Sequence, residues 1–235
     1  MKTIISEEKK FLVKDTSKDF HTKDGTIKSK DFNKSKVKTN KKVEFSILDP
    51  QFIDFYEKIK RGAQIISLKD IGAIITETGI NKNSKVLDAG SGSGALSCYL
   101  AHIVKEVITY DIEDTAIKIT KENIKFQDLK NIKIRKKNIC KGISEKNLDL
   151  ITLDLKEPWN ALSPAHKALK RGAFLVIYTP QITQALNCVN KIKNKFIHIK
   201  TKESAEREWK LEGKIAKPIT PLISHTGFLT FLRKV

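Results

Sequence analysis

One stretch decides the fold: Val86-Leu87-Asp88-Ala89-Gly90-Ser91-Gly92-Ser93-Gly94-Ala95-Leu96, in which an apolar strand runs into three alternate glycines and then a helix. Glycine permits a tight turn and lets a ligand approach where a Cβ would collide. A dinucleotide-binding turn spaces its glycines as G-x-G-x-x-G. The G-x-G-x-G spacing behind Asp88 instead favours S-adenosylmethionine, whose ammonium group this acid would attract. A glycine-rich turn without a ligand is the alternative.

A second acid follows the next predicted strand. The segment Val107-Ile108-Thr109-Tyr110 ends in Asp111, seventeen residues after the last glycine of the turn. A carboxylate at this point can accept hydrogen bonds from both ribose hydroxyls of a nucleoside. Its alternative role is the N-cap of a helix that begins near Glu113. The third strand leads to Asn138 and Ile139, where a side-chain amide would contact the adenine of the cofactor or form a turn.

Strands and helices alternate from Arg61 to the end of the chain. Strands are predicted near residues 85–88, 106–110, 132–136, 148–153, 173–178, 196–202 and 227–233, and helices near 69–78, 94–104, 113–127, 159–169 and 181–193. This alternation predicts an α/β fold with a parallel sheet covered by helices on both faces. Together with the glycine turn, it indicates the Rossmann-like, seven-stranded sheet of a class I methyltransferase that depends on S-adenosylmethionine.

Residues 1–60 follow a different pattern. Short alternating segments (11–13, 26–28, 36–38 and 43–47) are separated by polar turns such as Lys23-Asp24-Gly25, which is typical of small antiparallel strands. The chain is therefore predicted to comprise a small N-terminal β-domain, 1–60, and a catalytic domain, 61–235. The alternative for the first segment is a disordered basic tail.

The composition allows both domains and indicates a polyanionic partner. With 235 residues, of which 40% are hydrophobic, the chain can bury one α/β core and still form a smaller domain. Lysine and arginine total 45 against 27 acidic residues, which gives a formal charge of +18. A positive field of this strength favours nucleic acid as the partner, and a codon bias towards lysine is the alternative. Charge alone does not distinguish DNA from RNA.

The three cysteines, Cys98, Cys140 and Cys188, are odd in number and widely spaced. This pattern argues against a disulfide framework or a metal site and predicts reduced core thiols. The N-terminal segment turns acidic before any apolar run, and no segment is long enough to span a bilayer. We expect a cytoplasmic protein with neither a membrane span nor a bound metal.

The catalytic residue is expected after the fourth strand. That strand, 148–153, leads to Asp154-Leu155-Lys156-Glu157-Pro158-Trp159, and open α/β sheets bind ligands outside the carboxyl ends of their strands. A carboxylate here can accept a hydrogen bond from the exocyclic amine of a flat base, and an indole can wall the pocket. Alternatively, Asp154 caps the following helix, Pro158 lies in its first turn and Trp159 packs in the core.

Two further segments reach the same edge of the sheet. Tyr178, at the end of the fifth strand, could contact the base, although a half-buried tyrosine is also an ordinary strand residue. His225 and Thr226 place an imidazole and a hydroxyl on the loop before the last strand. A lone histidine is usually structural.

Together these residues resemble the tRNA adenine-58 N1-methyltransferases, which act on the T-loop adenine, and in particular their bacterial and archaeal homo-oligomeric branch. The resemblance covers nearly the whole chain. The motifs that carry it are Phe20-His21-Thr22-Lys23-Asp24-Gly25-Thr26-Ile27, Arg61-Gly62-Ala63-Gln64-Ile65-Ile66 with Asp70, Asp154-Leu155-Lys156-Glu157-Pro158-Trp159, Arg207-Glu208-Trp209, Lys217-Pro218 and His225-Thr226-Gly227-Phe228-Leu229. Many methyltransferases share the glycine turn and its acid, whereas these flanking motifs are specific.

The resemblance implies a function and a set of site residues. It implies that Asp154 is the catalytic carboxylate and that Asp111 holds the ribose. It also implies S-adenosyl-L-methionine as the cofactor, tRNA as the partner and a homotetramer. The substrate pocket is then lined by Gln64, Tyr178, His225 and Thr226. The residues expected to bind the cofactor are Gln64, Asp88, Gly90, Ser91, Gly92, Ser93, Gly94, Ala95, Leu96, Asp111, Asn138, Ile139 and Asp154.

Some positions depart from the pattern of that family. Ser67-Leu68 stands where a Tyr-Pro pair is common, Asp88 and Asp111 stand where Glu is frequent, Asn138 stands where an Asp is usual, and Lys217 stands where Arg is common. The Asp-for-Glu changes keep the charge, whereas Asn138 offers one acceptor oxygen fewer. A serine in place of tyrosine at Ser67 would alter base stacking or the choice of position.

The hypothesis is a direct transfer in which N1 of adenine attacks the methyl group and Asp154 accepts a hydrogen bond from the N6 amine. A rival is another class I methyltransferase, acting on protein isoaspartate or a small molecule, and the His225-Thr226-Gly227 motif argues against it. A second rival is a non-catalytic tRNA-binding subunit, and the intact glycine turn argues against that. No residue decides whether the adenine at position 57 is methylated as well.

Overall fold

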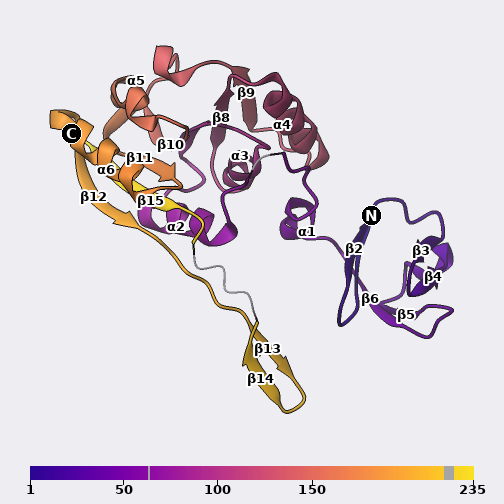
Figure 1. The fold of residues 1–235 in the computed structure, drawn as a ribbon. Coiled ribbons are helices and arrows are strands. Elements are labelled where there is room, and N and C mark those ends of the chain that lie inside the picture. The colour runs from indigo at the N-terminus through magenta and orange to yellow at the C-terminus, as the bar shows by residue number, and fades with distance from the viewer. Residues whose placement is uncertain (63, 220–224) are drawn as a thin grey trace. The chain divides into compact units, whose positions relative to one another are not determined.

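The structure, a computed structural model, describes residues 1–62, 64–219 and 225–235 (Figure 1). Ala63, which belongs to one of the motifs above, lies outside the described residues. The chain divides into two compact units, Met1–Ile59 and Lys60–Val235. Each unit has its own core and is described by itself.

The first unit contains a four-stranded antiparallel sheet and a short hairpin. The sheet has the order β2-β1-β6-β5, formed by β1 (Lys2–Ile5), β2 (Lys10–Val13), β5 (Lys36–Lys38) and β6 (Glu44–Leu48). The hairpin pairs β3 (Phe20–Thr22) with β4 (Gly25–Ile27), and the helices are η1 (Ser29–Asp31) and α1 (Phe52–Tyr56). Alternation along β6 buries Phe45 and Ile47 against Ile4 and Val13. The predicted small β-domain is confirmed, although β1 was not predicted.

The second unit is built on a seven-stranded sheet of order β12-β15-β11-β10-β7-β8-β9. Its strands are β7 (Lys85–Ala89), β8 (Glu106–Asp111), β9 (Ile132–Lys136), β10 (Leu148–Asp154), β11 (Leu169–Thr179), β12 (Phe196–Lys202) and β15 (Phe228–Lys234). The pairs from β11 through β10, β7 and β8 to β9 are parallel, as predicted.

The prediction of an entirely parallel sheet is wrong at β15, which pairs antiparallel with both β11 and β12. A parallel neighbour needs a crossover connection, usually a helix. The chain after β12 instead forms a hairpin of β13 (Trp209–Glu212) and β14 (Ile215–Pro218) before it returns as β15. This hairpin was not predicted.

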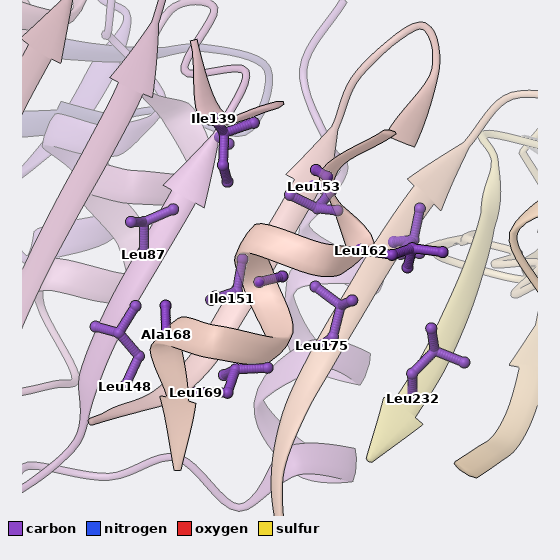
Figure 2. Packing of buried hydrophobic residues seen from close by; sticks show 14 of the residues in the cluster. Leu87, Ile139, Leu148, Ile151, Leu153, Leu162, Ala168, Leu169, Leu175 and Leu232 are labelled. Carbon is purple, nitrogen blue, oxygen red and sulfur yellow. The ribbon is translucent and has the colours of Figure 1, made fainter. Parts of the chain in front are cut away.

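Helices cover both faces of the sheet. They are α2 (Leu68–Thr78), α3 (Ala95–Ala101), α4 (Asp114–Phe126), α5 (Leu162–Ala168) and α6 (Ile182–Lys191), with shorter turns η2 (Ile139–Lys141), η3 (Pro158–Ala161) and η4 (Lys193–Lys195). On one face, Leu87 of β7 packs in a cluster with Leu162 of α5 (Figure 2). Cys188 of α6 belongs to the same cluster. The residue after Leu87, Asp88, points to the opposite face, where Ser97 of α3 donates a hydrogen bond to it. The predicted helix 159–169 is split into η3 and α5.

The cysteines and the helix lengths can be compared with the predictions from the sequence. All three cysteines are free, with Cys98 and Cys188 buried and Cys140 half-buried. No helix among the described residues combines the length and the apolar character needed to cross a membrane.

Candidate active site

The carboxyl ends of four parallel strands bring the predicted site residues to one edge of the sheet. Strand β8 ends at Asp111, β7 leads into Gly90, β10 ends at Asp154, and β11 carries Tyr178 next to its last residue. Asp154 and Tyr178 occupy paired positions in the β10–β11 register. In open α/β sheets this edge is where ligands bind.

The glycine turn has positive φ angles and packs closely against neighbouring segments at two of its three glycines. Gly90, Gly92 and Gly94 have φ angles of +90°, +54° and +75°. A Cβ at Gly90 would collide with the carbonyl oxygen of Asp154, and one at Gly94 would lie 2.7 Å from Thr120. A Cβ at Gly92 would meet nothing within 4 Å. Two of the three glycines are therefore required by the fold, and the third borders open space.

Asp111 fastens this turn to the start of α4. Its Oδ2 accepts hydrogen bonds from the Ser91 hydroxyl and the Gly92 N–H, each at 3.0 Å. Its Oδ1 accepts hydrogen bonds from the N–H groups of Ile112 and Glu113 at 2.7 and 2.9 Å. The N-cap position of α4 itself is Glu113. Asp111, the residue predicted to bind the ribose, thus holds the glycine turn through hydrogen bonds.

Asp88 is only 2% exposed, and its carboxylate is bound by hydroxyl groups from three elements. Ser97 of α3, Thr109 of β8 and Thr152 of β10 all donate to it, the last at 2.7 Å. Burial raises the pKa of this carboxyl. The sequence did not predict the two threonines, although each stands beside Asp88 in register on a neighbouring strand.

Two cavities adjoin the turn. The larger, of about 410 Å³, is lined by Ala89, Gly90, Tyr110, Asp111, Ile112, Lys137, Asn138, Ile139, Cys140, Leu155, Lys156, Glu157 and Asn160. The smaller, of about 30 Å³, is lined by Gln64, Ile65, Ile66, Asp88, Gly90, Ser91, Gly92, Ser93, Ala95, Leu96 and Asp154. Most of the predicted cofactor residues therefore line one of two adjacent hollows that share Gly90. A hollow of about 560 Å³ in the first unit contains none of them.

One serine and one asparagine at these cavities differ in their hydrogen bonding. The Ser93 hydroxyl is buried and has no hydrogen-bond partner among the described residues. The Asn138 Oδ1 accepts a hydrogen bond from the Cys140 N–H at 2.9 Å and so caps η2. The turn-forming role considered for Asn138 is therefore present, and the residue also lines the larger cavity.

Burial controls the ionisation of the two side chains at the ends of β10 and β11. Burial, with a contribution from the charge of Asp88, raises the pKa of Asp154 to about 7. Burial and the charge of Asp70 raise the pKa of Tyr178 to about 12. Tyr178 is therefore a neutral hydroxyl at physiological pH, whereas Asp154 exists in both protonation states.

His225 is held by contacts within the chain. Its Nδ1 lies 2.5 Å from Oε1 of Glu203 and its Nε2 lies 3.1 Å from the carbonyl oxygen of Pro180. Both partners are acceptors, so the protonated form of the ring can donate to both, and the hydrogen bond to Glu203 raises the pKa of His225. The ring thus joins three segments, and Glu203 is a partner that the sequence did not reveal.

The residue after His225 has equally close contacts. The Thr226 hydroxyl contacts Lys69 and Asp70 at the start of α2, and the Thr226 carbonyl oxygen accepts a hydrogen bond from the Tyr178 hydroxyl. The structure therefore brings Tyr178 and Thr226 together as the sequence predicted. Lys69 was missed, since nothing in its local sequence distinguishes it from the other lysines.

The other aromatic residue considered for the site packs against the core. Trp159, in η3, is partly buried against the cluster shown in Figure 2, and Nζ of Lys191 lies 4.9 Å from the centre of its ring. The core role is the one observed. Among the described residues, no group of three or more histidine, cysteine, aspartate or glutamate side chains is placed to hold a metal ion.

Comparison with known proteins identifies similar sequences. Residues 54–214 match the protein family described as "tRNA methyltransferase complex GCD14 subunit". The chain is 34% identical over 266 residues to the tRNA (adenine(57)-N(1)/adenine(58)-N(1))-methyltransferase TrmI of Methanocaldococcus jannaschii, an alignment that covers 99% of this chain and 94% of that protein. It is 32% identical over 204 residues to the tRNA (adenine(58)-N(1))-methyltransferase TrmI of Thermus thermophilus, covering 84% and 80% of the two chains.

Solved structures share the fold over the full chain. A SAM-dependent O-methyltransferase from Thermotoga maritima superposes with a TM-score of 0.90 at 28% identity and covers 100% of this chain and 92% of that one. The tRNA (m1A58) methyltransferase TrmI from Aquifex aeolicus superposes with a TM-score of 0.87 at 28% identity and covers 100% and 96%. Both confirm the Rossmann-like fold with an N-terminal β-domain.

Proposed function

Because the chain belongs to the tRNA methyltransferase family described as the GCD14 subunit, we propose that it transfers a methyl group from S-adenosylmethionine to N1 of adenine 58 in the T-loop of tRNA. The observation that carries the proposal is the position of Asp154. It ends β10 beside the glycine turn, pairs in register with Tyr178, and has a raised pKa because it is partly buried. The name of the M. jannaschii relative includes position 57, so that position is tested together with 58.

The residues around the glycine turn fit S-adenosylmethionine. Gly92 borders open space, so a ligand can approach the backbone there. The Ser93 hydroxyl, for which the described residues supply no partner, suits the polar amino-acid end of the cofactor, and the larger cavity beside Asn138 and Ile139 suits its adenine. Asp111 would hold the ribose, whose hydroxyls would take the places of the Ser91 and Gly92 donors. When bound, the cofactor supplies a methyl group on an electron-poor sulfonium.

Asp154 then acts on the methyl acceptor. In its ionised form, the carboxylate accepts a hydrogen bond from the N6 amine of adenine and stabilises the positive charge that develops on the base as N1 gains the methyl group. A neutral ring nitrogen needs no strong base, so the main tasks of the site are to position the base and exclude water. Positioning of this kind can lower a barrier by up to roughly 7–11 kcal/mol. Tyr178 and the segment at Thr226 would form the wall against which the base lies.

The acceptor adenine must leave its stack and pair before it reaches Asp154, at a cost of a few kcal/mol. Contacts with the surrounding phosphates can offset that cost. The segment from Lys28 to Lys42 of the first unit contains seven lysines, its two end residues included, and all of them are exposed. We assign residues 1–60 to tRNA binding and residues 61–235 to catalysis.

The hairpin of β13 and β14 supports the proposal of a homotetramer. Trp209 pairs with Pro218 and Leu211 pairs with Ala216, so these four apolar residues lie on one face of the hairpin. Trp209 is 56% exposed and Leu211 is 75% exposed. An apolar face of this kind marks a contact surface, and in a homo-oligomer a second copy covers it. The tRNA substrate and the free cysteines support a cytoplasmic location.

The proposal is tested with the Asp154→Ala variant of the full chain. Calorimetry measures the Kd for S-adenosylmethionine, and methyl incorporation measures the rate on tRNA. At saturating S-adenosylmethionine, which offsets any loss of cofactor affinity, we expect the rate to fall by at least roughly a hundredfold. An undiminished rate would remove Asp154 from the mechanism. Failure of the wild-type chain to bind the cofactor would favour a non-catalytic subunit.

A further inference from the structure

A buried ion pair lies at the start of α2. Nζ of Lys69 is 3.1 Å from Oδ1 of Asp70, and the two side chains are 7% and 1% exposed. Removing two charges from water is costly, and an apolar pair of similar size is often as stable or more stable. The stability of the fold alone therefore does not account for this pair, whereas a role in orienting other groups does.

The group that the pair orients is the hydroxyl of Thr226. This hydroxyl accepts a hydrogen bond from Nζ of Lys69 at 2.6 Å and donates one to Oδ2 of Asp70 at 2.6 Å. The Ser67 hydroxyl donates to the same Oδ2 at 2.9 Å. One donor and one acceptor thus fix the direction of the Thr226 hydroxyl. The acceptor, Asp70, lies 156 residues away in the sequence.

The backbone at Thr226 is fixed as well. The Tyr178 hydroxyl donates to the Thr226 carbonyl oxygen. A Cβ at Gly227 would collide with the ring of Tyr178, so the chain passes directly over that ring. Tyr178 is therefore held by the same segment that the ion pair holds.

These contacts join three segments around Asp154. Tyr178 pairs in register with Asp154 at the edge of the sheet. Gln64, Ile65 and Ile66, which line the small cavity with Asp154, stand directly before Ser67 and the ion pair. Thr226 thus links the start of α2, through Lys69 and Asp70, to the end of β11, through Tyr178.

We propose that Lys69 and Asp70 are positioning residues for methyl transfer, which hold Thr226 and Tyr178 so that the acceptor base lies against Asp154. This inference rests on the proposed function. Asp70 is too deeply buried to touch a substrate, and so it acts through Thr226 and Tyr178. Its removal should therefore lower kcat while binding of S-adenosylmethionine is kept.

The test compares Asp70→Asn, Thr226→Val, their double variant and Thr226→Ser in the full chain. The matched control is Thr76→Val, since Thr76 lies on the exposed side of the same helix and its hydroxyl donates to backbone carbonyls of α2. Kinetics on tRNA at saturating S-adenosylmethionine give kcat and KM, calorimetry gives the cofactor Kd, and thermal melts report folding.

We expect Asp70→Asn and Thr226→Val each to lower kcat by roughly ten- to a hundredfold, as misplacement of a substrate does. The cofactor Kd should stay within about twofold of the wild-type value, and Thr226→Ser should recover most of the rate because it keeps the hydroxyl. The double variant should be no slower than the slower single variant, since both changes break one network.

Wild-type kcat in both single variants, or effects that multiply in the double variant, would overturn the inference while the proposed function stands. If Asp70→Asn does not fold, equal rates for Thr226→Val and Thr226→Ser overturn the inference, and recovery by serine supports it. A wild-type chain that does not methylate tRNA at all overturns the proposed function itself, and the inference with it.

Discussion

Asp154, the last residue of β10, pairs in register with Tyr178, the last residue but one of β11, and burial raises the pKa of both side chains. The pKa of Asp154 is raised to about 7 and that of Tyr178 to about 12. At neutral pH the pair therefore combines a fixed hydroxyl donor with a carboxyl group that is near its midpoint. The protonation of both side chains therefore depends on how the sheet packs around them.

The first prediction concerns the pH dependence of the rate. Only the ionised form of Asp154 can accept a hydrogen bond without also donating one, so kcat/KM on tRNA should rise with pH and level off above about 7. Below that value it should fall by about tenfold per pH unit. Rates measured from pH 5.5 to 8.5 would show this, with Asp154→Asn low and flat as the control. A flat wild-type profile contradicts the assigned role.

The second prediction concerns the free energy of unfolding. The folded pKa of Asp154 lies above its ordinary value of 3.8, so its contribution to stability is full below about pH 4 and is lost as the pH rises through about 7. Asp154→Asn abolishes this loss. Between pH 5 and pH 8, the stability of the variant relative to wild type should increase by about 1–2 kcal/mol, allowing for solvent screening. Denaturant titrations at the two pH values measure it, and an unchanged difference would contradict the buried setting of Asp154.

The third prediction separates two glycines of the turn. Gly92→Ala should keep the fold, at a cost of about 1 kcal/mol for its positive φ, but weaken binding of S-adenosylmethionine by at least roughly tenfold. Gly79→Ala is the control, because Gly79 also has a positive φ of +66° and open space around it. Gly90→Ala should destabilise the fold itself, since its Cβ would collide with the Asp154 carbonyl oxygen.

Thermal melts and calorimetry on the three glycine variants distinguish these effects. Equal cofactor affinity in the Gly92→Ala and Gly79→Ala variants would show that the cofactor does not approach the turn at Gly92.

Much of the fold could be predicted from local pattern. The central parallel strands β7 and β10 are buried on both faces and so appear as short apolar runs, and Gly79 ends the predicted helix α2 with a left-handed φ. The reversed direction of β15 could not be predicted, because strand direction depends on how the chain returns to the sheet and not on the residues within the strand. The split of the predicted helix 159–169 was missed for a similar reason, since η3 and α5 have one continuous apolar pattern.

The site could be predicted where a motif places a residue at a strand end. Asp111 and Asp154 follow apolar strands and therefore reach the edge of the sheet. The partners of Asp88 and Thr226 could not be predicted. Thr152 reaches Asp88 from 64 residues away, and Lys69 reaches Thr226 from 157 residues away. Such pairs depend on the register and packing of the folded sheet.

The fourth prediction concerns the hairpin of β13 and β14. Replacing Trp209 and Leu211 together by serine removes the large side chains of its apolar face. If this face forms the contact of the proposed homotetramer, the variant should form smaller species than the wild type, because burial of apolar area at the contact is lost. Light scattering on the full chain measures the mass, with Lys210→Ser on the opposite face as the control. An unchanged mass would show that this face does not form the contact.

The most direct test of the proposed function is to map the methylated base. The purified protein is incubated with S-adenosylmethionine and an unmodified tRNA transcript, and nuclease fragments are analysed by mass spectrometry. We predict N1-methyladenine at position 58, with or without the neighbouring adenine at 57, and no product at 58 when a transcript carries guanine there or when Asp154→Ala replaces the wild-type protein. Methylation of a different atom or of a base outside the T-loop, or a tRNA left unmodified, would contradict the account.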